Sequence, residues 1–373
     1  MRHAFRMEGI WITEIAEPGD GIRLAVKDLF DTAGVTTTYG SALFAEHVPD
    51  ETAEAVRRLE DAGYATVGKA NLHEFAYGVT SENPHFGTVP NPAAPGRIAG
   101  GSSGGSAAAL AAGLADAALG TDSGGSIRIP AACCGVVGFK PTYGLVPLDG
   151  CFPLAPSFDH AGPMARSVEE CAAMMDALEP GLERAEARLG DLTVGVFGLA
   201  AADPLVRGRV AAAAALFPGA REIEFPDVEI SGAGFMREVA GIHRDLYDPE
   251  LYGEDVGRRV AACLEVTAAE ADAAEADRER FRADALAALD GLDLLLTPTL
   301  ALVAPPTGSV DHALRTRILR FTYPFNALGW PALAQPCGAA EDGLPASVQL
   351  VGRAGDDALV LAAGAALAAS LKN

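Results

Sequence analysis

The chain has 373 residues, 49% of them hydrophobic, so it is long enough to bury a large core as one large domain or two ordinary ones. Its 28 basic and 50 acidic residues give a net charge of −22, which argues against nucleic acids and anionic membranes as partners. The six cysteines show no CxxC pair and no His/Cys metal spacing, so we expect reduced, mostly buried thiols and no metal site.

Neither end of the sequence carries a targeting or membrane signal. Met1 to Asp20 contains several charges and lacks the apolar core of a signal peptide. The apolar run from Ala358 to Leu371 is too short to span a bilayer and predicts a packed helix. We therefore expect a cytoplasmic protein.

The stretch from Ile22 to Asp31, IRLAVKDLFD, predicts a buried strand with a lysine inside it. Burial disfavours the charged form of an amine, so the pKa of Lys27 is expected to fall from roughly 10.4 toward the range of a general base. Asp28 would oppose this if it were close, but consecutive side chains on a strand point to opposite faces. Lys27 is therefore the first candidate catalytic residue.

The next elements alternate between helix and strand. The sequence from Asp50 to Ala62 predicts an amphipathic helix with Asp50 as its N-cap, and Tyr64 to Val67 predicts a strand. Such alternation is typical of an α/β sheet covered on both faces. Gly63 to Lys69 also matches most of a phosphate-loop pattern. Because Ala70 replaces its final Ser or Thr and a strand replaces its loop, we expect no nucleotide cofactor.

Two glycine-rich serine clusters carry the strongest chemical signal. A proline-rich loop from Asn83 to Pro95 leads to the first, Gly100 to Ser106, which runs into a helix of small residues from Ala107 to Leu114. The second, Thr121 to Ser126, is a turn whose successive N–H groups can form an anion-binding concavity beside a serine hydroxyl. The pair predicts a nucleophile with its oxyanion donors.

The remaining elements predict structure more than chemistry. Asn71, Glu74 and Phe75 are expected to be scaffold residues near the site. Further along the chain the patterns predict a capping box at Ser167 to Glu170, a long solvated helix at Glu265 to Leu289, and strands at Leu192 to Leu199, Leu292 to Leu296 and Val348 to Val351.

Taken together, the motifs resemble the amidase signature family of serine hydrolases, whose triad is Ser-Ser-Lys. They stand in the family's order at residues 25–34, 68–78, 100–113, 120–132 and 138–147, with later pieces at 158–167, 297–299, 324–333 and 343–352. The resemblance implies one amidase signature domain over residues 1–373, with an α/β fold in which a mixed, twisted β-sheet is sandwiched between helices. Residues 180–290 are expected to be a variable, mostly helical region that shapes the substrate pocket.

Carried over residue by residue, the resemblance implies that Ser126 is the nucleophile, Lys27 the general base, and Ser102 the bridge that passes the proton between them. It also implies a cis peptide bond between Gly101 and Ser102. The backbone N–H groups implied for the oxyanion hole belong to Ser123, Gly124, Gly125 and Ser126. The implied reaction hydrolyses a small amide through an acyl-enzyme, releasing ammonia or an amine, with no cofactor.

Three neighbours are expected to support this site. Ser103 can hydrogen-bond the nucleophile or the bridge, or it can cap the helix that follows. Asp122 and Arg128 carry opposite charges and are expected to hold the loop through hydrogen bonds or an ion pair rather than to touch substrate.

Three alternatives stay open. A glutaminase-type subunit of a tRNA-dependent amidotransferase belongs to the same family and needs a protein partner, although the acidic charge counts against it. An esterase of the α/β-hydrolase class would use Ser102 with a late histidine such as His312, but no apolar strand precedes Ser102 as a nucleophile elbow requires. A catalytically silent protein that only keeps the fold is the third.

The acyl group, the amine and the residues that line the acyl pocket are not predicted by the sequence. Family members commonly have several dozen helical residues before the lysine strand, whereas 26 residues precede Lys27. The quaternary state is therefore also open, with a homodimer as one possibility.

Overall fold

The computed structural model describes residues 8–229 and 232–372, so the first part of the stretch from Met1 to Asp20 lies outside the described residues. The strands are β1 (Trp11–Glu14), β2 (Ile22–Lys27), β3 (Tyr64–Ala70), β4 (Glu82–Asn83), β5 (Gly87–Thr88), β6 (Ala117–Asp122), β7 (Val137–Lys140), β8 (His160–Ala165), β9 (Thr193–Val196), β10 (Gly219–Glu222), β11 (Leu294–Pro298), β12 (Ala332–Ala339) and β13 (Pro345–Val351). The α-helices are α1 (Glu54–Asp61), α2 (Gly104–Ala111), α3 (Arg128–Cys134), α4 (Val168–Leu178), α5 (Pro204–Ala214), α6 (Ala233–His243), α7 (Glu254–Leu264), α8 (Ala268–Ala288), α9 (His312–Leu319), α10 (Tyr323–Ala327) and α11 (Asp357–Leu371).

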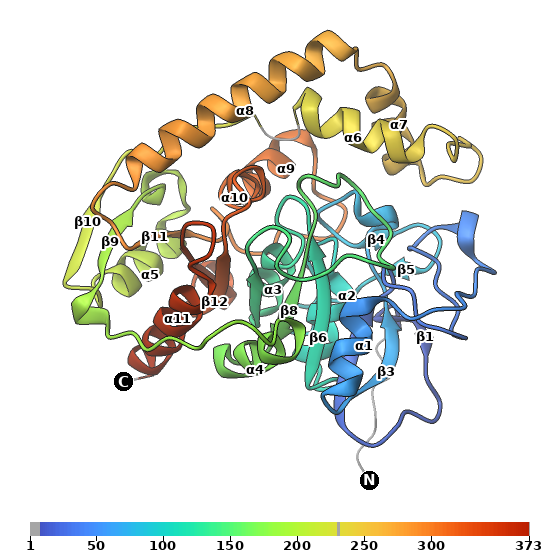
Figure 1. Cartoon of the computed structure of the whole chain (residues 1–373), viewed down its shortest axis with the longest axis horizontal. Helices are drawn as coiled ribbons and strands as arrows, with labels where there is room; N and C mark the ends of the chain where they lie inside the picture. The colour runs from blue at the N-terminus through green and yellow to red at the C-terminus, as the bar shows by residue number, and fades with distance from the viewer. Residues whose placement is uncertain (1–7, 230–231, 373) are drawn as a thin grey trace.

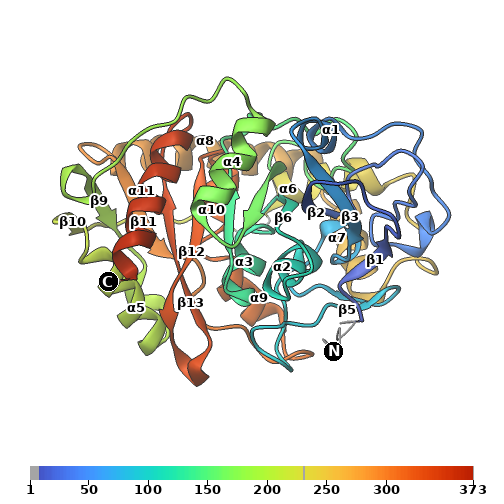
Figure 2. The ribbon, with the colours of Figure 1, turned by 90° about the horizontal axis from the view of Figure 1, so that it is seen from below.

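In the described chain, one eleven-stranded sheet runs through the molecule in the order β1-β3-β2-β6-β8-β7-β12-β13-β11-β9-β10 (Figure 2). Its centre, from β6 to β11, is antiparallel, while β3-β2-β6 and β11-β9-β10 are parallel. Helices cover both faces (Figure 1). The predicted fold class, a mixed sheet sandwiched between helices, is therefore confirmed.

Side-chain alternation along β2 determines the face of the sheet on which Lys27 lies. Leu24 and Val26 point into a core cluster that also contains side chains of α1, α4, α5 and α11. Ala25 points to the opposite face, into a cluster formed largely by the small residues of α2. Because alternate residues of a strand share a face, Lys27 lies on the α2 side with Ala25. The sheet thereby brings the lysine to the helix that follows the first serine cluster.

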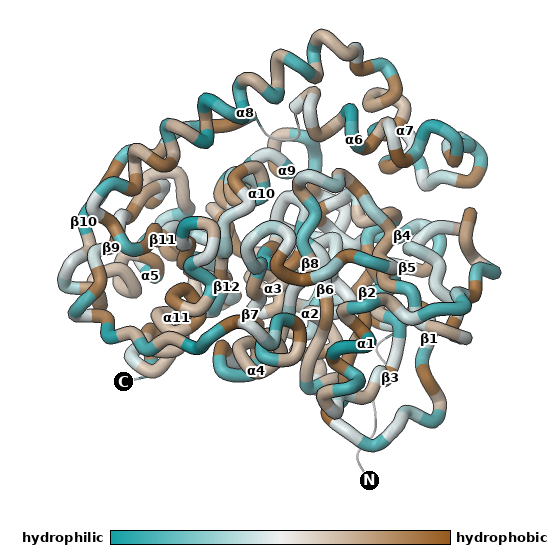
Figure 3. The backbone as a smooth tube through the Cα atoms, viewed as in Figure 1, coloured by the Kyte–Doolittle hydropathy of each residue, from teal (hydrophilic) through white to brown (hydrophobic). Residues whose placement is uncertain are grey.

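The region between residues 180 and 290 contains the helices α5, α6, α7 and α8 together with the strands β9 and β10. Its helices α6, α7 and α8 lie across one side of the sheet, where α8 forms the long outer arc in Figure 1. Polar segments recur along α8 in Figure 3, and its buried residues are Arg278, Phe281 and Ala285. The solvated helix predicted for Glu265 to Leu289 is confirmed, with a capping box at Thr267 and Glu270.

Some predicted boundaries are wrong. The helix expected from Asp50 begins at Glu54 with Ala53 at the N-cap, and the Glu54 carboxylate pairs with Arg57 and Arg58 instead of closing a capping box. The helix expected at Ala107 to Leu114 begins earlier and ends at Ala111, since Gly113 takes a left-handed conformation with φ of 71°. The capping box predicted at Ser167 and Glu170 is confirmed.

The six cysteines are free thiols, and five of them are buried. None of the helices in the described chain combines the length and the apolar character needed to cross a membrane.

Candidate active site

Lys27 ends β2 with its side chain fully buried between two hydroxyl groups. Its Nζ lies 2.7 Å from Oγ of Ser102 and 2.6 Å from Oγ1 of Thr121. Burial lowers the pKa of Lys27 to about 7, because the loss of solvation outweighs the opposing effect of nearby acidic groups such as Cys151 and Asp122. A substantial fraction of this amine is therefore neutral near neutral pH and able to accept a proton.

Asp28 does not share this site. Its carboxylate accepts hydrogen bonds from the backbone N–H and the hydroxyl of Thr38, at 2.8 and 2.6 Å, and lies 3.4 Å from Nζ of Lys69. Asp28 lies in the turn just after β2, so the strand alternation expected for it does not apply, and its separation from Lys27 comes from these contacts with Thr38 and Lys69.

Ser102 is held rigidly by its backbone. Its carbonyl accepts hydrogen bonds from the N–H of His73 at 3.2 Å and from the hydroxyl of Ser81 at 3.1 Å. The Ser81 hydroxyl in turn accepts from the N–H of Gly104, at 3.1 Å. The peptide bond between Gly101 and Ser102 is cis, as the family resemblance implies.

Ser126 lies in the turn between β6 and α3, and the N–H of Ser103 donates to its carbonyl at 3.1 Å. This contact brings the two serine clusters together. Ser126 is 7% exposed and lines a small cavity together with Ser123 and Gly124. Its hydroxyl makes no hydrogen bond to any residue in 8–229 or 232–372, so it is available to a molecule that enters the cavity.

The backbone donors of the turn divide into two groups. The N–H of Gly125, expected as one of four oxyanion donors, instead donates to Oδ1 of Asp122 at 2.7 Å. The N–H groups of Ser123, Gly124 and Ser126 make no hydrogen bond within the described residues. Three N–H groups thus remain available beside the Ser126 hydroxyl.

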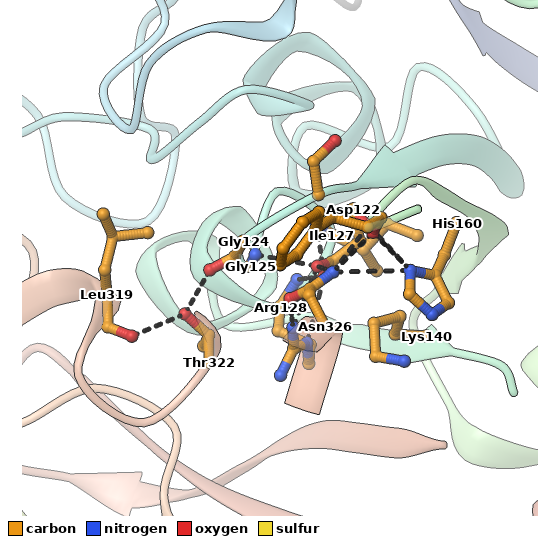
Figure 4. Close-up of polar contacts among 12 residues, drawn as sticks. Asp122, Gly124, Gly125, Ile127, Arg128, Lys140, His160, Leu319, Thr322 and Asn326 are labelled. Carbon is orange, nitrogen blue, oxygen red and sulfur yellow. Dashed lines mark hydrogen bonds and ion pairs between the residues drawn. The ribbon is translucent and has the colours of Figure 1, made fainter. Parts of the chain in front are cut away.

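A buried ion pair holds this turn in shape (Figure 4). Asp122 and Arg128 are both fully buried, and the guanidinium donates to both carboxylate oxygens, at 3.0 and 2.8 Å. Arg128 also donates to Asn326 at 2.6 Å and to Gln349 at 2.8 Å. Asn326 donates to the carbonyl of Asp122 and to its Oδ1, at 2.7 and 2.8 Å. The turn is thereby tied to α10 and to β13, about two hundred residues away in the sequence.

Burial alone would raise the pKa of Asp122. The charge and hydrogen bonds of Arg128, with Lys140 and Asn326 in support, instead hold that pKa well below its usual range. Asp122 is therefore ionised at neutral pH. Its carboxylate binds Arg128 and the N–H of Gly125, so we assign it a structural role in the turn.

A second cavity, of about 260 Å³, adjoins the site next to Ser123. Its polar lining includes Thr121, which also contacts Lys27, and Asp159, which accepts a hydrogen bond from the Ser123 hydroxyl. The half-buried Cys151 and the ring of Tyr143 complete this part of the wall. The two cavities share Ser123 and Leu154 in their walls.

Ser103 and His312 make other contacts than those considered from the sequence. The Ser103 hydroxyl neither contacts Ser102 or Ser126 nor caps α2, but bonds the carbonyl and the N–H of Thr121, at 3.2 and 3.3 Å. His312 is exposed at the start of α9, whereas Ser102 is fully buried against Lys27, so this pair does not form an esterase site.

The scaffold interpretation fits the residues after β3. Asn71 donates to the carbonyls of Gly9 and Gly87, at 2.9 and 3.0 Å. Glu74 accepts from the Ser41 hydroxyl at 2.7 Å and from the N–H of Gly253 at 2.9 Å.

Thr121, Ser81 and Asn326 were missed by the sequence analysis. Thr121 stands at the start of the second serine cluster, which is the only signal that could have drawn attention to it. Ser81 lies between Thr80 and Glu82, outside both clusters, and no motif marks it. Asn326 lies in the family-like piece at 324–333, which is the signal that could have drawn attention to it. In the described residues no group of three His, Cys, Asp or Glu side chains is placed to hold a metal ion.

The chain is similar to known proteins over nearly its whole length. A family model described as Amidase matches residues 13–186 and 247–361. The A subunit of glutamyl-tRNA(Gln) amidotransferase from Natronomonas pharaonis is 38% identical, over 94% of this chain and 96% of that protein. The AtzE subunit of 1-carboxybiuret hydrolase from Pseudomonas sp. (strain ADP) is 36% identical, over 95% and 85% respectively. A solved amidase structure, 39% identical, superposes with a TM-score of 0.83 over 94% of this chain and 85% of that one.

Proposed function

The chain belongs to the amidase family of enzymes that act on amide C–N bonds, and we propose that it hydrolyses a small carboxylic amide through an acyl-enzyme on Ser126. The observation that carries this proposal is the buried Lys27 amine, 2.7 Å from the hydroxyl of Ser102, with a pKa lowered to about 7. A neutral amine in contact with a serine hydroxyl is a general base with a bridge toward a second serine.

The proposed proton path uses the hydrogen-bonding capacity of each group. A neutral Lys27 donates one N–H to Thr121 and accepts the proton of Ser102 through its lone pair. Ser102 can then accept the proton of Ser126 as that hydroxyl attacks the amide carbon. Hydrogen bonds of this kind are often absent or long before substrate binds, so we expect the Ser102–Ser126 contact to form in the complex. The same path returns the proton to the leaving amine, and water then cleaves the acyl-enzyme.

The developing oxyanion is proposed to bind the N–H groups of Ser123, Gly124 and Ser126. These are the donors that the turn leaves uncommitted, whereas Asp122 occupies the N–H of Gly125. Loss of one donor from such a hole typically slows the reaction by about 100- to 1000-fold. The Asp122–Arg128 pair therefore supports catalysis by keeping this turn in one conformation.

A second candidate is the glutaminase-type subunit of a tRNA-dependent amidotransferase. It is favoured by the relatives named as the A subunit of glutamyl-tRNA(Gln) amidotransferase, which match over nearly their full length. The net charge of −22 argues against direct contact of this chain with tRNA. Glutamine hydrolysis that rises on addition of a co-purifying protein would favour this candidate, and hydrolysis of simple amides by the isolated chain would favour the first.

We also propose a cytoplasmic location, which the six unpaired cysteines support because reducing compartments keep thiols free.

Covalent labelling tests the nucleophile directly. A fluorophosphonate probe is expected to label the wild type, and Ser126→Ala is expected to abolish labelling and ammonia release together. Ser106→Ala is the matched control, since the Ser106 hydroxyl lies in the first serine cluster but donates to the Leu119 carbonyl, at 3.4 Å, and does not line the cavity at Ser126. Undiminished labelling of Ser126→Ala would overturn the assignment.

A further inference from the structure

One arginine side chain at the site has no hydrogen-bond partner among the residues that the structure describes. Arg315, on α9, lines the same small cavity as Ser126, Ser123 and Gly124. Its Nε is buried and makes no hydrogen bond within residues 8–229 and 232–372. Much of the remaining wall is apolar, with Val79, Leu154, Phe235 and Leu319 among its residues. A guanidinium thus lies beside the nucleophile without a carboxylate bonded to it.

The acidic residue of this neighbourhood is already satisfied. Asp255, on α7, lies 2.6 Å from Arg259, 3.1 Å from Arg258 and 3.4 Å from the ring of His73. Asp255 is the carboxylate whose charge acts on Arg315, and its oxygens are already paired with Arg259 and Arg258. Within the described residues, Arg315 therefore has no carboxylate of its own.

The charged form of Arg315 is destabilised by its surroundings in the protein. Burial and the like charge of Arg259 lower the pKa of Arg315, and Tyr77 and Asp255 oppose them more weakly. A guanidinium nevertheless remains protonated in proteins, so its desolvation is only partly offset by the described chain. Unfavourable polar arrangements of this kind are expected where a ligand completes them.

We propose that the substrate carries a carboxylate in addition to its amide, and that Arg315 binds this carboxylate while Ser126 attacks the amide carbon. This inference rests on the proposed function and specifies its substrate class, the monoamides of dicarboxylic acids. The paired N–H donors of a guanidinium match the two oxygens of a carboxylate, and apolar surroundings strengthen such charge-assisted bonds. Neutral amides of the same length make no such contact.

Matched substrates test the preference. Succinamate is compared with butyramide, and glutaramate with valeramide, so that a carboxylate replaces a methyl group at constant chain length. The wild type is expected to favour the carboxylates by about 10- to 100-fold in kcat/KM, the usual effect of one charge-assisted hydrogen-bond pair. Arg315→Met is expected to remove this preference and Arg315→Lys to keep part of it. Arg317→Met is the control, because Arg317 lies on the same helix but pairs with Asp203 at 2.8 Å.

A binding measurement separates this inference from the proposed function. Succinate and glutarate are titrated calorimetrically into the Ser126→Ala protein, with and without Arg315→Met, and the second substitution is expected to weaken binding by the same factor. If neutral amides are cleaved as fast as the carboxylates, the inference is wrong and the proposed function stands. If no amide is cleaved, the proposed function fails, and the titration alone then tests whether Arg315 binds a carboxylate. Binding that is unchanged by Arg315→Met, or no saturable binding, would overturn the role of Arg315.

Discussion

Replacing Arg128 by Met is expected to destabilise the protein strongly, because it leaves a carboxylate buried without its counter-ion. Arg128 and Asp122 are both fully buried, and the substitution removes both guanidinium bonds to Asp122 together with those to Asn326 and Gln349. Breaking a buried pair from one side costs about 3–5 kcal/mol. The surface pair of Arg184 with Asp176, 64% and 47% exposed, is the matched control, and Arg184→Met is expected to cost at most about 1 kcal/mol.

The pH dependence of this loss has a definite sign. In the wild type the pKa of Asp122 is depressed, so its contribution to stability is present above the unfolded-state pKa of roughly 3.9 and is lost only as the pH falls through the lower folded-state value. In Arg128→Met the largest opposition to burial is gone and only Lys140 and Asn326 still counter it, so that pKa rises. The variant therefore takes up a proton on folding in mild acid, and its deficit relative to the wild type shrinks as the pH falls from 7 toward 5.

Urea denaturation at pH 7 and pH 5 measures both effects. The double variant Asp122→Asn with Arg128→Met is expected to recover part of the loss, since it removes the uncompensated charge. A loss for Arg128→Met no larger than for Arg184→Met, or a deficit that grows on acidification, would refute this reasoning.

Two further substitutions probe the turn and the base. Gly125→Ala is expected to abolish fluorophosphonate labelling, because Gly125 has φ of 133° and an added Cβ would collide with the side chain of Thr322, whereas Gly19→Ala, in open space, leaves labelling intact. Full labelling of Gly125→Ala would contradict this. Thr121→Val removes an acceptor that favours the ammonium form of Lys27, so the rising, acid-side limb of the kcat/KM profile is expected to move to lower pH. A shift of that limb to higher pH would count against the assigned contact.

How much the sequence predicts depends on the range of the interaction. The position of Lys27 follows from local alternation on β2, and the capping box at Ser167 follows from residues three apart, so both could be inferred from short windows. The serine clusters could be singled out because a glycine-rich turn can present successive N–H groups to an anion beside a serine hydroxyl. The roles of Lys27, Ser102 and Ser126, and the extent of one domain over residues 1–373, remain predictions.

Long-range contacts account for most of what the sequence does not reveal. Asn326 and Gln349 reach Arg128 only after the sheet has brought β13 and α10 beside the turn. Nothing in the sequence distinguishes the N–H of Gly125 from those of its neighbours. Only the folded position of the Asp122 carboxylate shows that this N–H is already bonded. Arg315 is likewise outside every sequence motif, and only the cavity that it lines together with Ser126 shows that it is close to the site.

The measurement that tests the central claim most directly is the pre-steady-state rate of Ser126 acylation between pH 5 and 9, in the wild type and in Lys27→Ala. With a Lys27 pKa of about 7, the wild-type rate is expected to rise about tenfold per pH unit below that value and to level off above it. Lys27→Ala is expected to lose this rise in rate with pH, and its rate is expected to be about 100- to 10,000-fold lower than that of the wild type. A wild-type rate that is flat across this range, or an unimpaired Lys27→Ala, would contradict the account.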